Sequence, residues 1–568
     1  MKIASPVETL VTDHLDLWTA ALKRKSTAGR GSSSKVELYG IKKLRELILE
    51  LAVRGLLVPQ DPNDEPASEL LKKIAGEKAR LGVKKRRLEE LGDDAFSSRT
   101  EKLPRGWQWA KAASLFPTKS GNSKLIKGKL YDNPSEDLFP GYSASGQDVW
   151  LDRWEHEGTA IILSAVGARC GKAFMAKGKW SAIANTHIVW VVPTITLPEF
   201  AMLHLNNESY WIRSGGAQPF VKVGETLARD FPLPPLAEQH RIVAKVDALM
   251  ALCDRLEQQT DASLGAHQTL SETLLSALTS AADHAQFASA WQRIAGHFDT
   301  LFTTEESIAQ LKQTILQLAV MGKLVPQDPN DEPARTLLKR IQTEKARLIA
   351  GGKIKKDKPL PPIADDEKSF ELPQSWAWVK PEEFSIKITD GEHFRPPVEE
   401  SGVYFLSAKD VREGGVSFDD PLFISEETAR KALQRCNPEY GDLLIVSRGA
   451  TVGRMCKVNT HEKFCLLGSV ILVKPTTLVL SDYLSISLKS PSSFSKLINA
   501  SGSTAQPAIY LKDLKRIAFP LPPIEEQHRI VAKVEELMAL CDQLKSRLSD
   551  AQTTQLHLAD ALVELAIC

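Results

Sequence analysis

Apolar residues recur at alternating intervals of four and three positions in two segments of the chain. The first segment carries them at Ile242, Val246, Leu249, Cys253 and Leu256, with Leu270 and Leu274 continuing the pattern after a polar stretch. The second carries them at Ile530, Val534, Leu537, Cys541, Leu544, Leu548, Leu558, Leu562 and Leu565. This spacing is the seam of a coiled coil, so it predicts two long helices that bury narrow apolar stripes on other helices.

Shorter seams of the same kind occur at Ile41, Leu44, Ile48 and Leu51 and at Ile308, Leu311, Ile315 and Leu318. Pro66 and Pro333 each follow an acidic residue and are expected at the first position of a further helix. The simplest arrangement packs the central helices against the N- and C-terminal ones, in a pseudo-two-fold fold. The alternative is that the seams pair with a second copy of the chain.

Short apolar or β-branched runs between turns predict strands at 160–168, 187–192, 441–447 and 469–475. A helical stretch is expected before each Phe-Pro-Leu-Pro-Pro string, which begins at Phe231 and at Phe519. Two mixed α/β domains of about 130 residues each follow from this pattern.

The chain contains a tandem duplication. The string LVPQDPNDEPA occurs at Leu57–Ala67 and again at Leu324–Ala334, and the 26-residue strings that begin at Phe231 and Phe519 match at 21 positions. A weaker repeat pairs LPRGWQWAK from Leu103 with LPQSWAWVK from Leu372. The blocks between these matched segments, 112–230 and 381–518, share only thin cues. Among these cues, Ser164, Gly171 and Lys172 align with Ser447, Gly453 and Arg454. One architecture therefore carries two different inserts, which suggests one kind of task performed on two targets.

Composition is that of an ordinary globular protein, with 568 residues, 43% hydrophobic, 25% charged and a net charge of +1. The seven cysteines form no Cys-x-x-Cys pair, so neither a zinc site nor a disulfide framework is expected, and a reducing cytoplasm is the natural compartment. Acidic residues at Glu8, Asp13 and Asp16 argue against a signal peptide, and no apolar run is long enough to predict a membrane span.

The balanced net charge hides local basic blocks. Residues 23–87 hold 17 Lys and Arg against 8 Asp and Glu, and residues 428–474 hold 8 against 3. A solvated surface is the usual reason for such a block, so charge alone does not decide whether the chain binds nucleic acid.

None of the candidate catalytic motifs in the sequence is complete. GARCGK at Gly167–Lys172 is too short for a phosphate-binding loop and has Ala173 in place of the magnesium-binding hydroxyl, so a strand-turn-strand element is expected instead. The Asn437–Tyr440 segment departs from the Asn-Pro-Pro-Tyr motif of adenine methyltransferases and is expected to form a turn before a strand. His240 and His528 recur at a helix start, where we expect them to cap or pack the helix. The chain is therefore predicted to bind and not to catalyse.

The duplicated FPLPPLAEQHRIVAKV and FPLPPIEEQHRIVAKV strings, with ITDGEHFRPP from Ile388 and GDLLIVSRGATVG from Gly441, resemble the specificity subunit of type I restriction-modification enzymes. The LVPQDPNDEPA segment resembles the subgroup with an extended N-terminal conserved region. The resemblance implies an N-terminal helical region (1–101), target recognition domain 1 (102–235), a central helical spacer (236–370), target recognition domain 2 (371–523) and a C-terminal spacer helix (524–568). It implies a mixed α/β fold, with two α/β recognition domains joined by long antiparallel coiled-coil helices.

By the same resemblance, the chain is a non-catalytic, cytoplasmic reader of double-stranded DNA. Each domain would read one half of a split asymmetric site, and the helices would set the spacing and dock two modification subunits. Those subunits would bring S-adenosylmethionine for adenine methylation, and restriction subunits would add ATP- and magnesium-dependent cleavage. The chain itself is expected to hold no cofactor, metal or membrane anchor.

Candidate DNA contacts are polar residues in turn-rich parts of the inserts, because Arg, Lys, Asn and Gln dominate base and phosphate contacts. In the first domain they are Lys119, Lys124, Arg169, Lys172 and Gln218, and in the second they are Lys409, Arg448, Arg454, Lys457 and Gln506. For each, the alternative is an ordinary solvated side chain. Trp107, Trp109, Trp376 and Trp378 lie in the matched segments and are expected to pack, not to stack on bases.

Two other classes of function compete with DNA recognition. A coiled-coil scaffold that joins two protein-binding domains would explain the near-zero net charge and the heptads. A stand-alone enzyme is disfavoured by the missing motifs. A fall in duplex affinity with rising salt would separate the DNA reader from the scaffold.

Overall fold

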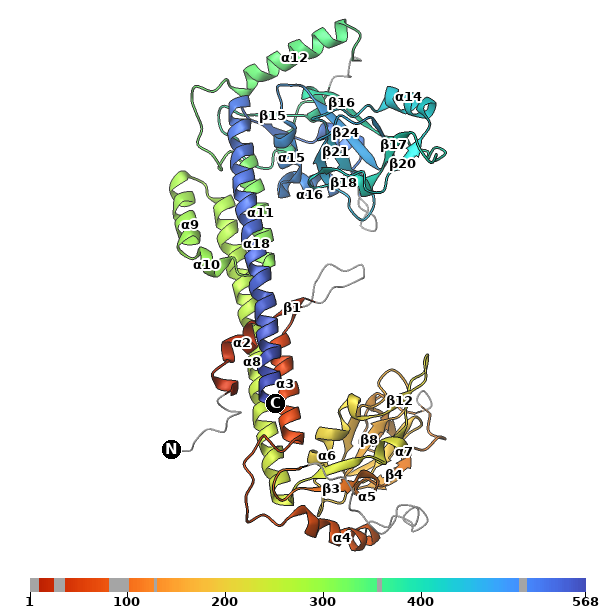
Figure 1. Ribbon diagram of the computed structural model, residues 1–568. Helices are drawn as coiled ribbons and strands as arrows, with labels where there is room; N and C mark the ends of the chain where they lie inside the picture. Colours follow the sequence, from red (N-terminus) through yellow and green to blue (C-terminus); the bar gives the residue numbers. More distant parts are fainter. Residues whose placement is uncertain are drawn as a thin grey trace. The chain divides into compact units, whose positions relative to one another are not determined.

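The structure is a computed structural model that describes residues 10–24, 36–80, 102–126, 130–354, 360–499 and 508–567 (Figure 1). The chain divides into two compact units, unit 1 with residues 1–263 and 551–568, and unit 2 with residues 264–550. Within the described residues, no helix combines the length and the apolar character that crossing a membrane would need.

Three helical segments pack side by side in unit 1 (Figure 1). They are α3 (Tyr39–Val53), the first part of α8 (Leu236–Ser280) and the end of α18 (Ile524–Ile567). The Tyr39 hydroxyl donates to Asp560 at 2.8 Å, and Arg54 donates to the Ile567 carbonyl at 3.3 Å, so α3 runs parallel to the end of α18. Arg45, at the middle of α3, contacts Asp254 of α8 at 2.7 Å.

Unit 1 carries a mixed α/β domain after the helix α4 (Ala67–Arg80). Its main sheet has the antiparallel order β4-β11-β8-β9 (Thr118–Ser120, Thr186–Val189, Ala160–Ser164 and Ala173–Ala176). A second sheet has the order β6-β5-β10-β7 (Gly146–Leu151, Phe139–Ser143, Lys179–Ala182 and His156–Glu157). The helices α5 (Ala112–Leu115), α6 (Pro198–Leu205) and α7 (Val223–Leu227) complete the domain, with the β12–β13 hairpin (Arg213–Ser214 and Phe220–Val221).

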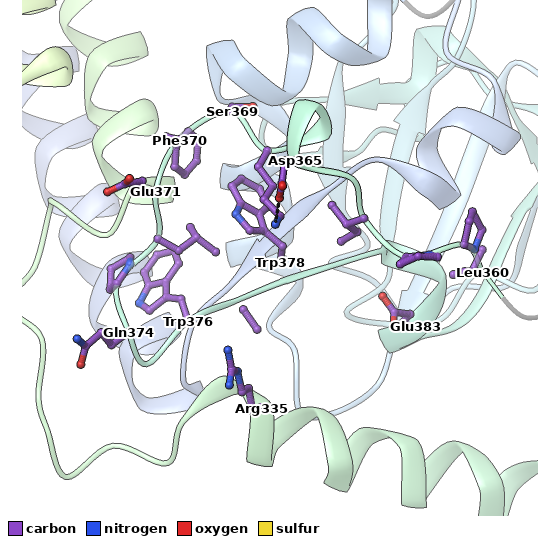
Figure 2. Close-up of a pocket in the computed structure, with 17 residues that line it drawn as sticks. Arg335, Leu360, Asp365, Ser369, Phe370, Glu371, Gln374, Trp376, Trp378 and Glu383 are labelled. Carbon is purple, nitrogen blue, oxygen red and sulfur yellow. Dashed lines mark hydrogen bonds and ion pairs between the residues drawn. The ribbon is translucent and has the colours of Figure 1, made fainter.

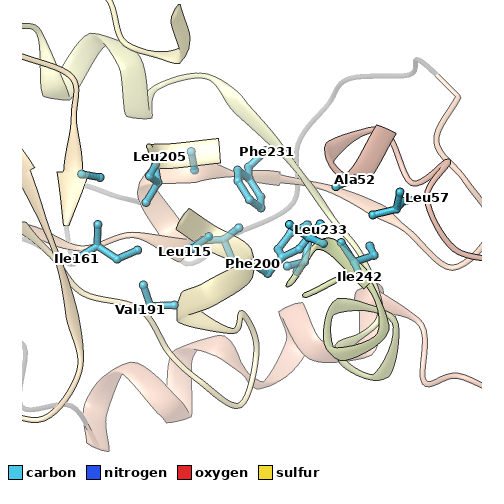
Figure 3. Close-up of a cluster of buried hydrophobic side chains, with 14 of the residues drawn as sticks. Ala52, Leu57, Leu115, Ile161, Val191, Phe200, Leu205, Phe231, Leu233 and Ile242 are labelled. Carbon is cyan, nitrogen blue, oxygen red and sulfur yellow. The ribbon is translucent and has the colours of Figure 1, made fainter. Parts of the chain in front are cut away.

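The domain enters and leaves the helical part through one antiparallel pair, β3 (Gln108–Lys111) with β14 (Asp230–Leu233). One apolar cluster spans the join, because Phe231 and Leu233 of β14 pack with Phe200 of α6 and with Ile242 of α8 (Figure 3). All four side chains are essentially removed from water. The domain is therefore fixed to its helix by a shared core.

Unit 2 repeats this arrangement. Its helical part is formed by α11 (Glu305–Val320), the start of α18 and the end of α8, with α9 (His284–Gly296), α10 (Phe298–Leu301) and α12 (Ala334–Ala350). Lys312 contacts Asp542 at 2.5 Å and Gln327 contacts Glu526 at 2.5 Å, so α11 runs antiparallel to α18.

The α/β domain of unit 2 is built on the antiparallel sheet β16-β24-β21-β22 (Ser385–Asp390, Val470–Pro475, Leu443–Val446 and Met455–Lys457). A second sheet has the order β20-β17-β23 (Leu422–Ile424, Val403–Leu406 and Phe464–Leu466). Its helices are α14 (Glu426–Arg435), α15 (Ser481–Lys489), α16 (Pro491–Asn499) and α17 (Leu511–Arg516). The pair β15 (Ala377–Val379) and β25 (Phe519–Leu521) joins the domain to α18.

The predicted mixed α/β class, the long helices and the four predicted strands are confirmed, as are the short helices before each Phe-Pro-Leu-Pro-Pro string. The seam residues Ile242, Val246, Leu249 and Cys253 are buried inside unit 1, so this part of the seam is occupied by helices of the same chain. The two short helices begin at Ala67 and Ala334, one residue later than predicted.

Three seam positions were wrong. Leu270, Leu558 and Leu565 are 52%, 51% and 75% exposed. The buried face runs instead through Ser271, Leu275 and Leu278 in α8 and through Ala559 in α18. A straight helix has 3.6 residues per turn, so over several turns its buried face drifts away from positions that repeat every 3.5 residues. One extra residue between successive buried positions brings the pattern back to the buried face.

Candidate nucleic-acid interface

Four segments of unit 1 meet at the edge of the main sheet where β4 and β8 end. The Gly121 amide donates to the Thr186 carbonyl at 2.8 Å, and the Gly167 amide donates to the Pro219 carbonyl at 2.8 Å. The Val221 amide reaches back to the Ala165 carbonyl at 2.9 Å. We call this region the turn edge of unit 1; it comprises residues 121–124, 165–172, 183–185 and 218–221.

The same construction occurs in unit 2 where β16 and β21 end. The Gly391 amide donates to the Val470 carbonyl at 3.2 Å, and the Ser447 amide donates to the Ser469 carbonyl at 2.8 Å. The Ile509 amide donates to the Ser447 carbonyl at 2.9 Å. The turn edge of unit 2 comprises residues 391–395, 447–454, 467–469 and 508–509.

Glycine makes the central turn of each edge possible. Gly171 and Gly453 hold positive φ angles of 98° and 83°, a region that other residues rarely adopt. In unit 2 a side chain at this position would also meet the Phe494 ring, 2.1 Å from the nearest ring atom. The strand-turn-strand element predicted at Gly167–Lys172 is confirmed, and unit 2 has the same element between β21 and β22.

In unit 1 the structure brings four of the five predicted DNA contacts to the turn edge. Lys124, Arg169, Lys172 and Gln218 all lie there, and all four side chains are exposed. Lys119 lies on the adjoining strand β4 and is also exposed. Arg213, which no sequence motif marks, also lies against Gly171 because the β12–β13 hairpin folds back there, but it is paired with Glu208 at 2.7 Å.

In unit 2 the predicted residues are divided. Arg448 is exposed in the central turn, and Arg454 is half-buried at its end. Lys409 follows β17 and is paired with Asp420 at 2.6 Å, a hydrogen bond that raises the pKa of Lys409. Lys457 lies at the far end of β22, paired with Asp482 at 2.7 Å. Gln506 lies outside the described residues.

The two turns correspond with a constant offset. The Ser164 amide donates to the Lys172 carbonyl at 2.8 Å, just as the Val446 amide donates to the Arg454 carbonyl at 2.8 Å. Lys172 and Arg454 are therefore equivalent, as predicted. Ser164 corresponds to Val446, however, and not to Ser447 as the sequence comparison suggested, because that comparison let the register slip by one residue.

A buried polar network holds each domain on its helix. In unit 1, Glu238 Oε1 accepts hydrogen bonds from Trp107 Nε1 at 3.0 Å and from Gln60 Nε2 at 3.2 Å. One turn further along the helix, Arg241 pairs with Asp64 at 2.5 Å. Burial raises the pKa of Glu238, although its hydrogen bonds with Trp107 and Gln60 oppose the rise.

The network of unit 2 uses the equivalent residues in a different pattern. Glu526 Oε2 accepts from Trp376 Nε1 at 2.9 Å, and Glu526 Oε1 accepts from Gln327 Nε2 at 2.5 Å. Arg529 pairs with Asp331 at 2.5 Å. Burial raises the pKa of Glu526 as well. The three repeats found in the sequence are thus the three parts of one contact network.

The glutamate of this network was missed, and the histidine beside it was misjudged. Glu238 and Glu526 are fully buried, whereas His240 and His528 are exposed and do not pack the helix start as expected. Both residue types recur identically in the repeat, and only their positions around the helix distinguish them. They are two residues apart, which is about 200° around a helix with 3.6 residues per turn, so they face opposite sides. The predicted packing role of Trp107 and Trp376 is confirmed, since their side chains are 7% and 4% exposed.

Next to the network of unit 2 lies a cavity of about 1090 Å³ (Figure 2). The segment 360–376 and the side chains of Trp378 and of Arg335, on α12, line it. Phe370 packs on Trp378 with ring centroids 5.1 Å apart, so Trp378 also serves as a packing residue. The cavity brings together none of the predicted DNA contacts.

Comparison with known proteins identifies the family. The family model for the type I restriction modification DNA specificity domain matches residues 151–265 and 402–551. The EcoAI specificity subunit of Escherichia coli is 40% identical over 590 aligned positions, which cover 99% of this chain and 100% of that one. The EcoEI specificity subunit of the same species is 39% identical, with the same coverage.

Solved structures give weaker likenesses. The HsdS subunit from Thermoanaerobacter tengcongensis is 19% identical, with a TM-score of 0.39 over 82% of this chain and 98% of that one. A chain from a type I R-M system reaches a TM-score of 0.42, also at 19% identity, over 82% of this chain and 99% of that one. The family assignment rests on the sequence relatives. Given 40% identity over nearly the full length of both proteins, the chain belongs to the type I restriction-enzyme specificity subunits.

Proposed function

We propose that each unit reads one half of a split, asymmetric DNA sequence with its turn edge. As a specificity subunit, the chain recognises DNA and leaves the chemistry to its partners. The observation that carries the proposal is the duplicated turn edge, which presents different polar side chains from the same backbone construction in the two units.

The exposed side chains of the turn edge suit this task. Lysine and arginine neutralise phosphates and supply affinity, while arginine and glutamine can donate to base edges in the major groove. In unit 1, Lys124, Arg169, Lys172 and Gln218 are exposed at this edge, and Lys119 is exposed on the adjoining strand. In unit 2, Arg448 and Arg454 are the first candidates, and Gln506 remains a candidate by its position in the sequence.

Lys409 and Lys457 are weaker candidates. Each is engaged in an ion pair within unit 2, with Asp420 and Asp482 respectively. DNA would have to displace a carboxylate from each, so a contact with a phosphate would replace an existing interaction and not add one. We therefore rank them below Arg448 and Arg454.

The long helices are proposed to set the distance between the two half-sites. Helix α8 has 45 residues and α18 has 44, so each is about 66 Å long at 1.5 Å per residue. Each passes from one unit into the other, at 263/264 and at 550/551. Half-sites on one face of a duplex recur near a helical turn, about 34 Å, which lies within this length.

The partners follow from the family. Two modification subunits would dock on the helical regions and bring S-adenosylmethionine for adenine methylation. Restriction subunits would bring ATP and magnesium, while this chain would hold no cofactor of its own. We place the complex in the cytoplasm, where the host DNA lies.

The first test is to co-express the chain with its modification subunit and to map methylated adenines in the host genome by single-molecule sequencing. A split, asymmetric motif that disappears when the chain is deleted supports the proposal. Exchange of residues 112–230 for the block of another family member should then change one half of that motif only. A change in both halves would contradict the assignment of one half to each unit.

The spacing role has a separate test. One heptad inserted at 263/264 of α8 and a second at 550/551 of α18 leave the packing inside each unit intact. Seven residues add about 10 Å, so we expect the gap to widen by about three base pairs at 3.4 Å each. An unchanged gap with full methylation would refute the role of the helices as a spacer.

A further inference from the structure

Phe394 is an apolar side chain that the fold leaves in water. It is 88% exposed, the largest value among the exposed large hydrophobic residues of the described chain. It lies on the turn edge of unit 2, in the loop that connects β16 with β17. A phenyl ring that is almost fully exposed to water contributes nothing to the core, and an exposed apolar group of this kind indicates an interaction site.

The loop that carries Phe394 is anchored on both sides. The Glu392 amide donates to the Leu466 carbonyl at 2.8 Å, and the Gly468 amide donates back to the Glu392 carbonyl at 2.7 Å. On the far side, the Glu399 amide donates to the Phe423 carbonyl at 2.9 Å. Pro396 and Pro397 restrict the backbone between the anchors. The ring is therefore presented by a constrained loop.

Phe394 has charged neighbours of both signs, since Glu392 lies two residues before it and Arg395 follows it directly. His393 Nε2 lies 2.8 Å from Arg435 Nη2, and Arg435 also pairs with Asp390 at the end of β16. Arg395 is exposed and forms no ion pair with any described residue. The edge thus presents an apolar ring directly beside Arg395, whose exposed cation fits a polyanion that also offers stacked apolar surfaces.

We propose that Phe394 inserts as a wedge between two base pairs of the half-site read by unit 2, with Arg395 and Arg448 on the flanking phosphates. The inference rests on the proposed function. Apolar side chains such as phenylalanine insert between base steps in other DNA-binding proteins, where they unstack the step and kink the duplex by about 20–90°. Stacking a base on an aromatic ring accounts for a factor of about 5 to 150 in affinity.

The two units differ at this position. The Gly121 and Asn122 amides of unit 1 bond to its sheet as Gly391 and Glu392 do in unit 2, and the bridges Asn122–Ile183 and Glu392–Leu467 are equivalent. Counting onward from these bridges places Lys124 where unit 2 has Phe394. A lysine binds phosphate and does not stack between bases, so an inserted wedge is expected in only one half of the recognised sequence.

The test uses the chain assembled with its modification subunits and a duplex that carries the methylation motif. The adenine analogue 2-aminopurine is placed at successive positions, because its fluorescence rises when it is unstacked. The modification subunits extrude the adenines that they methylate, so 2-aminopurine at those positions is expected to be bright in both halves. Away from the target adenines, we expect one further bright step with the unaltered chain, in the half-site of unit 2 and not in the other half. Phe394→Ala should abolish this signal and weaken binding about 5- to 150-fold, and Phe394→Leu should lie between the two.

Tyr440→Ala is the matched control. Tyr440 is 58% exposed and stacks on His461, but it precedes β21 and so lies at the opposite edge of the same sheet. It should leave both signal and affinity unchanged. Full fluorescence and full affinity in Phe394→Ala would overturn the wedge. If Phe394→Ala instead lost its modification subunits in the absence of DNA, the wedge would also be wrong, because the ring would then bind protein. If the unaltered complex shows no preference for its methylation motif, the proposed function itself fails.

Discussion

The substitution Glu526→Gln is expected to loosen the attachment of the unit 2 domain, whereas Glu238→Gln is expected to be tolerated in unit 1. The difference arises from which carboxylate oxygens accept hydrogen bonds. In Glu526 both do, one from Trp376 and one from Gln327. An amide has only one oxygen, so its NH2 group must face a donor. Gln327 cannot turn its own amide without losing the hydrogen bond that its Oε1 accepts from Ser375 at 3.1 Å.

In unit 1 the geometry allows the exchange. Glu238 Oε1 accepts both hydrogen bonds, and Oε2 is buried without a hydrogen-bond partner among the described residues. A glutamine can keep both bonds on its oxygen and put its NH2 group where Oε2 lay. A buried donor that faces another donor instead of an acceptor lowers the free energy of unfolding by about 1–3 kcal/mol. We therefore expect that cost for Glu526→Gln and less than about 1 kcal/mol for Glu238→Gln.

Hydrogen exchange of the intact chain measures the two sites separately. The amides of the β15–β25 pair report on unit 2, and those of the β3–β14 pair report on unit 1. A loss of about 1–3 kcal/mol speeds exchange about 5- to 150-fold if opening is local. Each variant serves as the control for the other. Equal acceleration in both, or a larger effect at Glu238, would show that the negative charge and not the donor geometry governs the attachment.

Three further predictions follow from the same structure. Burial raises the pKa of Glu526 above its unfolded value near 4.3, and a protonated carboxyl, unlike an amide, keeps acceptor lone pairs on both oxygens, so protonation of Glu526 stabilises unit 2. This contribution is full below the unfolded pKa and is lost as pH rises through the folded pKa. The protection of the β15–β25 amides, corrected for the intrinsic exchange rate, should therefore fall with rising pH in the unaltered chain and not in Glu526→Gln. Gly453→Ala should lower the free energy of unfolding by about 2–5 kcal/mol in thermal unfolding, because the backbone strain of a positive φ adds to the clash of the new Cβ with the Phe494 ring. Gly449→Ala should cost only about 1–2 kcal/mol, since its Cβ would meet open space. Equal losses in the two variants would contradict this reasoning. Lys172→Glu should weaken DNA binding and lower the slope of log affinity against log salt by about one, while Lys177→Glu, at the other end of β9, should change neither.

The repeats and the apolar pattern were sufficient to predict the two α/β domains, the long helices and the packing of Trp107 and Trp376. These features depend on local periodicity or on identity between the two copies, which a single sequence displays. The exposure of Leu558 and Leu565 was not predictable in this way, because small departures from a strict heptad accumulate along a long helix.

The candidate site was only partly predictable. Lys124, Arg169 and Gln218 come together because antiparallel pairing brings the ends of distant strands to one edge, and no spacing rule in the sequence encodes that pairing. The ion pair of Lys457 with Asp482 depends in the same way on the packing of α15 against β22. Composition and turn content could therefore nominate basic residues but could not show which of them the fold had already neutralised.

The strand pairs at the base of each domain have an evolutionary consequence. Lys111 is the cross-strand partner of Asp230, and Val379 is that of Phe519, so the chain leaves and re-enters the helical part at one place in each unit. Mutation, insertion or recombination between those points leaves the residues of the buried network and of the long helices unchanged, provided that the insert still supplies the side chains that pack at the join, such as Phe200. Selection for new DNA targets and selection for assembly thus act on separate stretches of one gene, which fits the retention of 21 matching positions in 26 outside the inserts while the inserts themselves have diverged.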